Sequence, residues 1–165
     1  MKTINEKIKV LTNIAKQFNK DNIVWAVGAS TMLYCRNIVA EFNDLDLMVA
    51  EKDALKAKEI LMNMGDLKES TSGSYATKHF YEFIIAGVEV DVMAGFKIIK
   101  DDVIYDCSLK VEDIKESVLI NDEDVPLDLL DNWLYYYKLM DRSQKVSLIE
   151  NYLAKQQLTN REEKK

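Results

Sequence analysis

Two aspartates, Asp44 and Asp46, are separated by one residue at the start of an apolar segment that runs to Val49. Residues two apart in a β-strand point to the same face of a sheet, so both carboxylates are expected on one face and Leu45 and Leu47 on the other. Two like charges placed side by side repel each other, and a bound cation relieves that repulsion. The pair is therefore a candidate for part of a cation site.

The spacing alone does not identify a site, because Asp-x-Asp occurs again at Asp122–Asp124. That second copy lies in a polar segment, where acidic residues are ordinary turn material. The first pair differs because a third carboxylate is available to it. Valines alternate with acidic residues over 88–92, so Asp91 is expected on the polar face of another strand. If the two strands are neighbours, Asp44, Asp46 and Asp91 converge as a ligand set suited to Mg²⁺ or Mn²⁺.

Three small residues, Gly28-Ala29-Ser30, follow an apolar segment at 23–27 and precede a short helix expected from Thr31 to about Asn37. Backbone N–H groups at such a helix start can bind phosphate. Gly28 would allow a ligand to approach the backbone, and Ser30 could donate a hydroxyl hydrogen bond. A strand–glycine–helix junction is common, so the tripeptide alone is more often a simple tight turn.

Periodicity predicts the elements that must position these residues. Apolar residues three and four apart indicate helices over 4–19, over 54–64 and from 127 onward, and apolar runs indicate strands at 23–27 and 45–49. Hairpins are expected for 81–85 with 88–93 around Ala86-Gly87, and for 117–120 with 125–127 across the connection 121–124. Gly65 is expected to end the second helix in a left-handed conformation, Pro126 suits a strand end or edge, and Thr71–Ser74 reads as a loop.

These elements amount to one α/β (α+β) unit of ordinary domain size. Residues 1–126 are expected to form the α/β core, and 127–158 a small C-terminal helical lobe packed on it. The polar residues 159–165 are expected to be a frayed tail.

Composition excludes several classes of protein. The chain has 28 acidic and 22 basic residues, which argues against an extended surface for nucleic acid. A single histidine, His79, rules out zinc sites built from several histidines, and it falls in an expected strand as a half-exposed residue. Cys35 and Cys107 match no metal or redox spacing and are expected to be reduced packing residues. No signal peptide or membrane span is apparent, so a soluble cytoplasmic protein is expected.

Aromatic residues gather late in the chain, at Trp133 and Tyr135–Tyr137. One hypothesis is a wall that stacks on a base or an aromatic acceptor. The alternative, which we favour, is that Trp133 and Tyr137, four residues apart, pack on the core while Tyr135 and Tyr136 are interfacial.

The order of the motifs carries a more specific signal. An apolar strand is followed by Gly28-Ala29-Ser30, a short helix, Asn43 to Val49 with its two aspartates, and a later strand, Val88-Glu89-Val90-Asp91-Val92. Over about residues 8–155 the chain resembles the nucleotidyltransferase superfamily of the polymerase-beta type. It is most similar to small bacterial members such as the lincosamide and aminoglycoside nucleotidyltransferases. The fold implied is a mixed sheet flanked by helices, with a small C-terminal helical lobe.

The resemblance implies roles for the motif residues. Gly28 and Ser30 match the residues that hold the nucleotide phosphates. Asp44 and Asp46 match the metal-binding pair, and Asp91 matches a third carboxylate that also helps to activate the attacking hydroxyl. The metal implied is Mg²⁺ or Mn²⁺.

The C-terminal lobe adds basic residues to this comparison. Lys138, with Arg142 and Lys145, lies in a stretch that approaches the nucleotide in some members, and Lys138 is the candidate nucleotide ligand. Solvated helix charges explain the stretch equally well. The chain departs from the pattern at Ala29, where Gly or Ser is commoner, and at Asn43, where Ser or Thr often precedes the first carboxylate.

Three hypotheses for function follow. The first is a metal-dependent enzyme that transfers a nucleotidyl group from an NTP to a hydroxyl of a small molecule or protein. The second is a regulatory module of the same fold, antitoxin-like, that binds nucleotide or a partner without robust turnover. The third, a degenerate structural copy, is disfavoured because all three aspartates are intact. The acceptor, the base preference and whether the chain forms a homodimer are left open.

Overall fold

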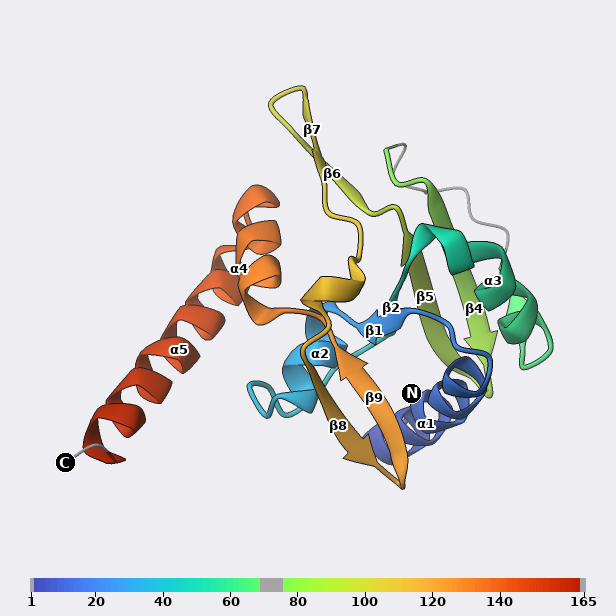
Figure 1. Ribbon diagram of the computed structural model, residues 1–165, viewed down its shortest axis with the longest axis horizontal. Helices are drawn as coiled ribbons and strands as arrows, with labels where there is room; N and C mark the ends of the chain where they lie inside the picture. Colours follow the sequence, from blue (N-terminus) through green and yellow to red (C-terminus); the bar gives the residue numbers. More distant parts are fainter. Residues whose placement is uncertain (1, 69–75, 164–165) are drawn as a thin grey trace.

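The computed structural model describes residues 2–68 and 76–163, which form a mixed sheet, a separate hairpin and five α-helices (Figure 1). The helices are α1 (Ile4–Lys20), α2 (Ala29–Cys35), α3 (Ala54–Met62), α4 (Leu130–Leu139) and α5 (Ser143–Glu163), with short 3₁₀ turns at Glu51–Asp53 and Val111–Asp113. The strands are β1 (Trp25–Val27), β2 (Leu45–Val49), β3 (Asp66–Leu67), β4 (His79–Ile85), β5 (Val88–Ala94), β6 (Lys97–Lys100), β7 (Val103–Asp106), β8 (Glu116–Ile120) and β9 (Glu123–Leu127). The mixed α/β fold expected from the sequence is confirmed.

Seven strands form one sheet in the order β3-β4-β5-β2-β1-β9-β8. β2 runs parallel to β5, and β1 runs parallel to β9, while every other neighbouring pair is antiparallel. The pairing of β2 with β5 matters most for the site, because it is the adjacency on which the predicted carboxylate cluster depends.

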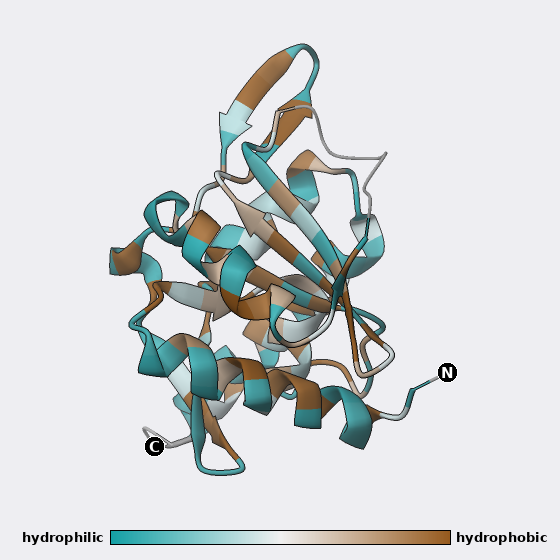
Figure 2. Cartoon of the chain, turned by 90° about the vertical axis from the view of Figure 1, so that its right-hand side faces the viewer, coloured by the Kyte–Doolittle hydropathy of each residue, from teal (hydrophilic) through white to brown (hydrophobic). Residues whose placement is uncertain are grey.

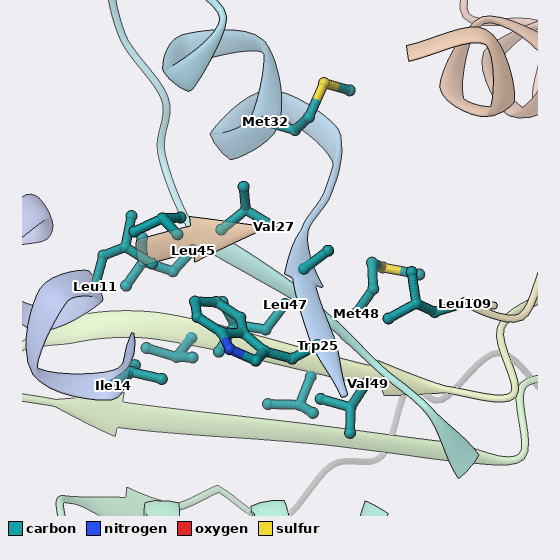
Figure 3. Packing of buried hydrophobic residues seen from close by; sticks show 14 of the residues in the cluster. Leu11, Ile14, Trp25, Val27, Met32, Leu45, Leu47, Met48, Val49 and Leu109 are labelled. Atoms are coloured by element: carbon teal, nitrogen blue, oxygen red, sulfur yellow. The ribbon is translucent and has the colours of Figure 1, made fainter. Parts of the chain in front are cut away.

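The two faces of the sheet are used differently. Leu45, Leu47 and Val49 of β2 are fully buried and point toward α1, where Ile14 and Trp25 pack beside them (Figure 3). Met48 of the same strand points the other way, toward Leu109 (Figure 3). Asp46 is two residues from Met48 in the same strand and points to the same side, so its side chain lies on the face opposite α1.

Two turns confirm or sharpen the expected hairpins. Ala86 and Gly87 join β4 to β5 with φ of 49° and 78°, as the primed turns of two-residue hairpins require. β8 and β9 are joined by Asn121 and Asp122 alone, both with positive φ. The connection expected over 121–124 is therefore too long, and Asp124 belongs to β9 because Asn and Asp together already reverse the chain.

Gly65 does not act as the predicted left-handed helix terminator. α3 ends at Met62, and Gly65 is absent from the positive-φ residues of the described chain. A Cβ at this position would lie 2.7 Å from Ile85 Cγ1 and would collide with the backbone carbonyl of Ile84. The glycine is needed because the chain passes close against β4 here. The loop predicted at Thr71–Ser74 lies outside the described residues.

The β6–β7 hairpin was not predicted from the sequence. It projects from the sheet and carries hydrophobic residues (brown in Figure 2). Its turn residues, Asp101 and Asp102, both have positive φ. The sequence shows no polar–apolar alternation here, because the adjacent residues Ile98 and Ile99 are both apolar although Ile98 is buried and Ile99 is exposed.

The chain from Leu130 onward is helical as expected, and α5 continues to Glu163, into the segment 159–165 that was expected to be a frayed tail. Arg161 and Glu162 of that tail are exposed and are good helix formers, so helix propensity and not burial favours the helix there. α5 extends away from the sheet (Figure 1). The division into a core at 1–126 and a lobe at 127–158 stays a prediction. Among the described residues, no helix is long and apolar enough to cross a membrane.

Candidate functional site

A row of carboxylates crosses the open face of the sheet. Asp46 of β2 lies opposite Asp91 of β5, and Asp91 in turn lies opposite Glu82 of β4. Residues directly opposite one another in neighbouring strands point to the same face, so these three acidic side chains share it. Each is partly exposed, which leaves the row accessible to a ligand.

Burial and like charge act together on the acidic side chains of this row. Burial first, and then the negative charges of Asp91 and Asp44, hold the pKa of Asp46 well above its usual range, while Lys145 opposes the shift. Burial, followed by Asp44 and Glu82, raises the pKa of Asp91 to about 6, and Lys68 opposes it. Both causes disfavour the ionised carboxylate.

Asp44 lies at the edge of this row, just before β2. Burial and then a hydrogen bond with Glu89 raise its pKa, and Lys7 and Lys68 oppose the shift. A hollow of about 350 Å³ opens beside Asp44 and is lined also by Lys7 and Glu89. A larger hollow, about 800 Å³, lies between α1 and β8 and contains none of the predicted site residues.

The structure places Asp46 and Asp91 on one face of the sheet and Asp44 just before β2, at the edge of the row. Within residues 2–68 and 76–163, no three His, Cys, Asp or Glu side chains are close enough to hold one metal ion. The donor set nevertheless fits Mg²⁺ or Mn²⁺, because it consists of carboxylate oxygens whose mutual repulsion a cation would relieve. The three-carboxylate metal site at Asp44, Asp46 and Asp91 stays a prediction.

The Gly28 turn borders this row directly. The Gly28 N–H donates to the Asp46 carbonyl at 3.0 Å, so the turn continues the ladder that carries the carboxylate. A Cβ at Gly28 would lie 2.7 Å from Trp133 Cζ2 and 2.9 Å from Met48 Cγ. The glycine is therefore required by the close approach of the Trp133 ring, a reason that the sequence analysis did not find.

Ala29, the departure from the family pattern, has φ of 49°, a left-handed conformation that L-residues adopt at a cost. Gly28 provides no side-chain cap for α2, so no N-cap side chain satisfies the first N–H groups of the helix. α2 spans seven residues and is as short as the helix expected from the sequence, but it begins at Ala29 and not at Thr31.

A lysine from α5 reaches the turn. Lys145 Nζ donates to Ser30 Oγ at 3.0 Å, and its charge also acts on Asp46. Lys138, the predicted nucleotide ligand, is exposed and lines a hollow with Lys100 and Tyr135. Of the basic stretch identified in the sequence, Lys145 is thus the member that the structure brings to the turn.

Thr31 fixes the carboxylate segment to α2, a role that sequence analysis missed. Its side chain is fully buried, its Oγ1 donates to the Asp44 carbonyl at 3.0 Å, and it accepts from the Asp46 N–H at 3.0 Å. A buried hydroxyl must find partners, and here both come from the backbone that presents the two aspartates. In the sequence, only the position of a threonine on the buried side of an apolar helix indicated this role.

The late aromatic residues form the wall behind the turn. Trp133, Tyr136 and Tyr137 are buried, while Tyr135 is exposed. Burial, and then the charge of Asp46, raise the pKa of Tyr137 to about 12, and a hydrogen bond with Ser30 opposes the shift. Core packing is confirmed for Trp133 and Tyr137, whereas Tyr136 is buried rather than interfacial.

Comparison with known proteins supports the fold. No family model and no curated protein matches the chain. A crystal structure from Thermotoga maritima, provisionally described as a nucleotidyltransferase, aligns with a TM-score of 0.71 and 21% identity over 93% of this chain and 96% of that one. The crystal structure of ANT(2″)-Ia in complex with adenylyl-2″-tobramycin aligns with a TM-score of 0.63 and 12% identity, covering 93% of each chain.

The solution structure of the antibiotic-resistance factor ANT(2″)-Ia gives a TM-score of 0.58 and 12% identity over 98% of each chain. All three similarities cover nearly the whole chain at low identity, so they bear on architecture rather than on substrate. The resemblance suggested by the motif order is thereby confirmed at the level of the fold. The chain has the nucleotidyltransferase fold.

Proposed function

We propose that this protein transfers a nucleotidyl group from an NTP to a hydroxyl of a small molecule or protein, with Mg²⁺ or Mn²⁺ as cofactor. The observation that carries the proposal is the placement of Asp46 opposite Asp91, one hydrogen bond away from the Gly28 turn. Carboxylates for a cation and a turn for phosphates are the two halves of a site for a metal–nucleotide complex.

The residues divide the work as follows. Asp44, Asp46 and Asp91 would hold the cation, which when bound neutralises phosphate charge and polarises the reacting oxygens. Lys145 and Ser30 would bind the phosphates at the turn, because an ammonium and a hydroxyl are donors suited to phosphate oxygens. The acceptor oxygen attacks the α-phosphorus in line, and the bond to the bridging oxygen of the β-phosphate breaks, so pyrophosphate leaves.

Asp91 would accept the proton of the attacking hydroxyl. Without a metal, burial and neighbouring acids raise the pKa of Asp91 to about 6, and a bound cation would lower that pKa. The carboxylate would therefore be ionised at neutral pH and able to accept a proton. Most of the rate would come from holding the reactants in line and neutralising their charge.

A second candidate is a module that binds nucleotide or a partner without robust turnover. The observation that favours it is that the described acidic side chains do not form a finished three-ligand group. The two candidates share the nucleotide and differ in whether pyrophosphate is released.

The test is Asp46→Asn, measured by calorimetric titration with ATP and Mg²⁺. The amide keeps the size of the side chain and removes its charge, so metal-dependent ATP binding should be lost while the fold is retained. The matched control is Asp122→Asn, in the other Asp-x-Asp of the chain, where a left-handed turn residue tolerates Asn.

Unchanged affinity for ATP and Mg²⁺ in Asp46→Asn would refute the proposed site. Release of pyrophosphate in the presence of an acceptor mixture would then separate the enzyme from the binding module, since only the first produces it.

A further inference from the structure

A buried carboxylate outside the proposed site stands directly behind the Gly28 turn. Asp128 is 2% exposed, and it is the only charged residue among the buried side chains of the described chain. It follows the last residue of β9, and its N–H donates to the carbonyl of Val27, the residue before Gly28, at 3.0 Å. Burying a charge is costly, so a buried carboxylate needs hydrogen-bond or charged partners.

The Asp128 carboxylate uses both of its oxygens. Oδ1 accepts from the Leu129 N–H at 2.8 Å, and Oδ2 accepts from the indole Nε1 of Trp133 at 2.9 Å. The Arg36 guanidinium donates to the Asp128 backbone carbonyl at 2.8 Å. Asp128 thus joins the end of β1, the end of α2 and the first turn of α4.

Trp133 transmits this arrangement to the turn. Its ring is 2% exposed, stacks on Phe96 at 5.9 Å between centroids and packs against Tyr137 at 5.4 Å. The ring also occupies the space in which a Cβ of Gly28 would lie, at 2.7 Å. A rotation of the indole would therefore displace the Gly28 backbone or open a gap beneath it.

We infer that Asp128 is a positioning residue, whose carboxylate holds the Trp133 ring as the support of the Gly28 turn and thereby sets the geometry of nucleotide binding. The inference rests on the proposed function, because it assigns Asp128 to the same nucleotide site. Asp128 acts through Trp133 and contacts no reacting atom.

The molecule contains a matched control for the indole hydrogen bond. Trp25, the other tryptophan, donates its Nε1 to Asn19 Oδ1 at the same 2.9 Å. Trp25 packs on the α1 face of the sheet (Figure 3), opposite the carboxylate row. Asn19→Ala therefore removes an indole bond of the same length, together with the bond from Asn19 Nδ2 to the Asp124 carbonyl, at a tryptophan that does not contact the turn.

The experiment measures the affinity for a nonhydrolysable ATP analogue with Mg²⁺ by calorimetry, together with the two indole N–H signals by ¹H–¹⁵N NMR. Asp128→Asn and Trp133→Phe should each weaken binding about tenfold, as loss of a bond to a charged group predicts. Asn19→Ala should bind as the wild type does. The double variant Asp128→Asn/Trp133→Phe should bind no more weakly than whichever single variant binds less tightly, because both changes remove the same hydrogen bond between Asp128 and Trp133.

The NMR signals distinguish a positioning role from a merely structural one, because only the first predicts that nucleotide binding shifts the Trp133 indole signal. Adding the analogue to the wild type should shift the Trp133 indole signal and leave that of Trp25 in place. If Asp128→Asn fails to fold, Trp133→Phe and this wild-type titration still decide the inference.

Two outcomes would overturn the inference about Asp128 and leave the proposed function standing. One is that the losses of affinity add in the double variant. The other is that a folded Asp128→Asn keeps its affinity although its Trp133 signal has moved. A wild type that binds no nucleotide would overturn the proposed function and the inference with it. The two failures are distinguishable because the second is seen before any variant is made.

Discussion

At the scale of single residues, the facing carboxylates of Asp46 and Asp91 are the most informative feature. Their pKa values are raised by burial and by neighbouring acids, which means that the metal-free folded chain holds protons more tightly than the unfolded chain. A group of this kind makes the folded state less stable as the pH rises.

The consequence is a defined pH dependence of stability in EDTA. For Asp91 the relevant window runs from its ordinary pKa of 3.8 to about 6, and the free energy of unfolding should fall as the pH rises through it, then level off. Urea unfolding at pH 5 and pH 7.5 measures this difference. The difference should shrink in Asp91→Asn and persist in Asp122→Asn; an equal difference in all three proteins would contradict the assignment.

Ala29 offers a test of backbone conformation at the same scale. A φ of 49° costs an L-residue about 1–2 kcal/mol, and glycine does not bear this cost. Glycine is more flexible in the unfolded chain, however, so folding it costs about 0.5–1 kcal/mol more in entropy. Ala29→Gly should therefore raise the free energy of unfolding by roughly 0.5 kcal/mol. Ala50→Gly, at a residue with φ of −63°, should lower it, and urea unfolding of both variants provides the comparison.

At the scale of elements, the site is a junction between strands and a short helix. β2 and β5 place their carboxylates side by side, and α2 is tied to the segment before β2 through Thr31. The helix therefore does more than connect β1 to β2. It holds the backbone from which Asp44 and Asp46 project.

Thr31→Val should loosen that attachment. The variant keeps the shape of the side chain and leaves a buried carbonyl and N–H without their partner, which costs roughly 1–3 kcal/mol of stability. Nucleotide affinity should fall with it, whereas Thr31→Ser, which keeps the hydroxyl, should recover both. Calorimetry and urea unfolding test this; a Ser variant no better than Val would assign the effect to the lost methyl contacts.

At the scale of the whole molecule, the C-terminal helices pack against the candidate site. α4 brings Trp133 and Tyr137 against the Gly28 turn, and α5 brings Lys145 to Ser30. Residues 154–162 of α5 are exposed, so any contribution of this helix to nucleotide binding is expected from its first turns.

Lys145→Met should show that contribution directly. The variant retains an apolar stem of similar length and removes the charge, so affinity for ATP and Mg²⁺ should fall roughly 10- to 100-fold, as for the loss of a charge-assisted contact. Lys155→Met, an exposed position on the same helix, should bind as the wild type does. Equal affinities in calorimetry would exclude Lys145 from the phosphate site.

The sequence by itself determined the elements and the faces of the strands. Period-two alternation around Asp46 and Asp91 and the small residues of the Gly28 turn are local properties, so the carboxylates could be placed on polar strand faces before any fold was known. The motif order then predicted the nucleotidyltransferase fold. The β6–β7 hairpin was not predicted because apolar residues occupy both sides of its short strands, as at Ile98 and Ile99, so no polar–apolar alternation marks them.

Only the tertiary structure decided which strands are neighbours and which distant side chains meet. β2 and β5 are far apart in the chain, and their pairing is a property of the whole sheet. The contact of Lys145 with Ser30, the close approach of Trp133 to Gly28 and the hydrogen bond from Trp133 to Asp128 all depend on how α4 and α5 pack. Packing partners cannot be read from spacing, because periodicity says which face is buried and not what it is buried against.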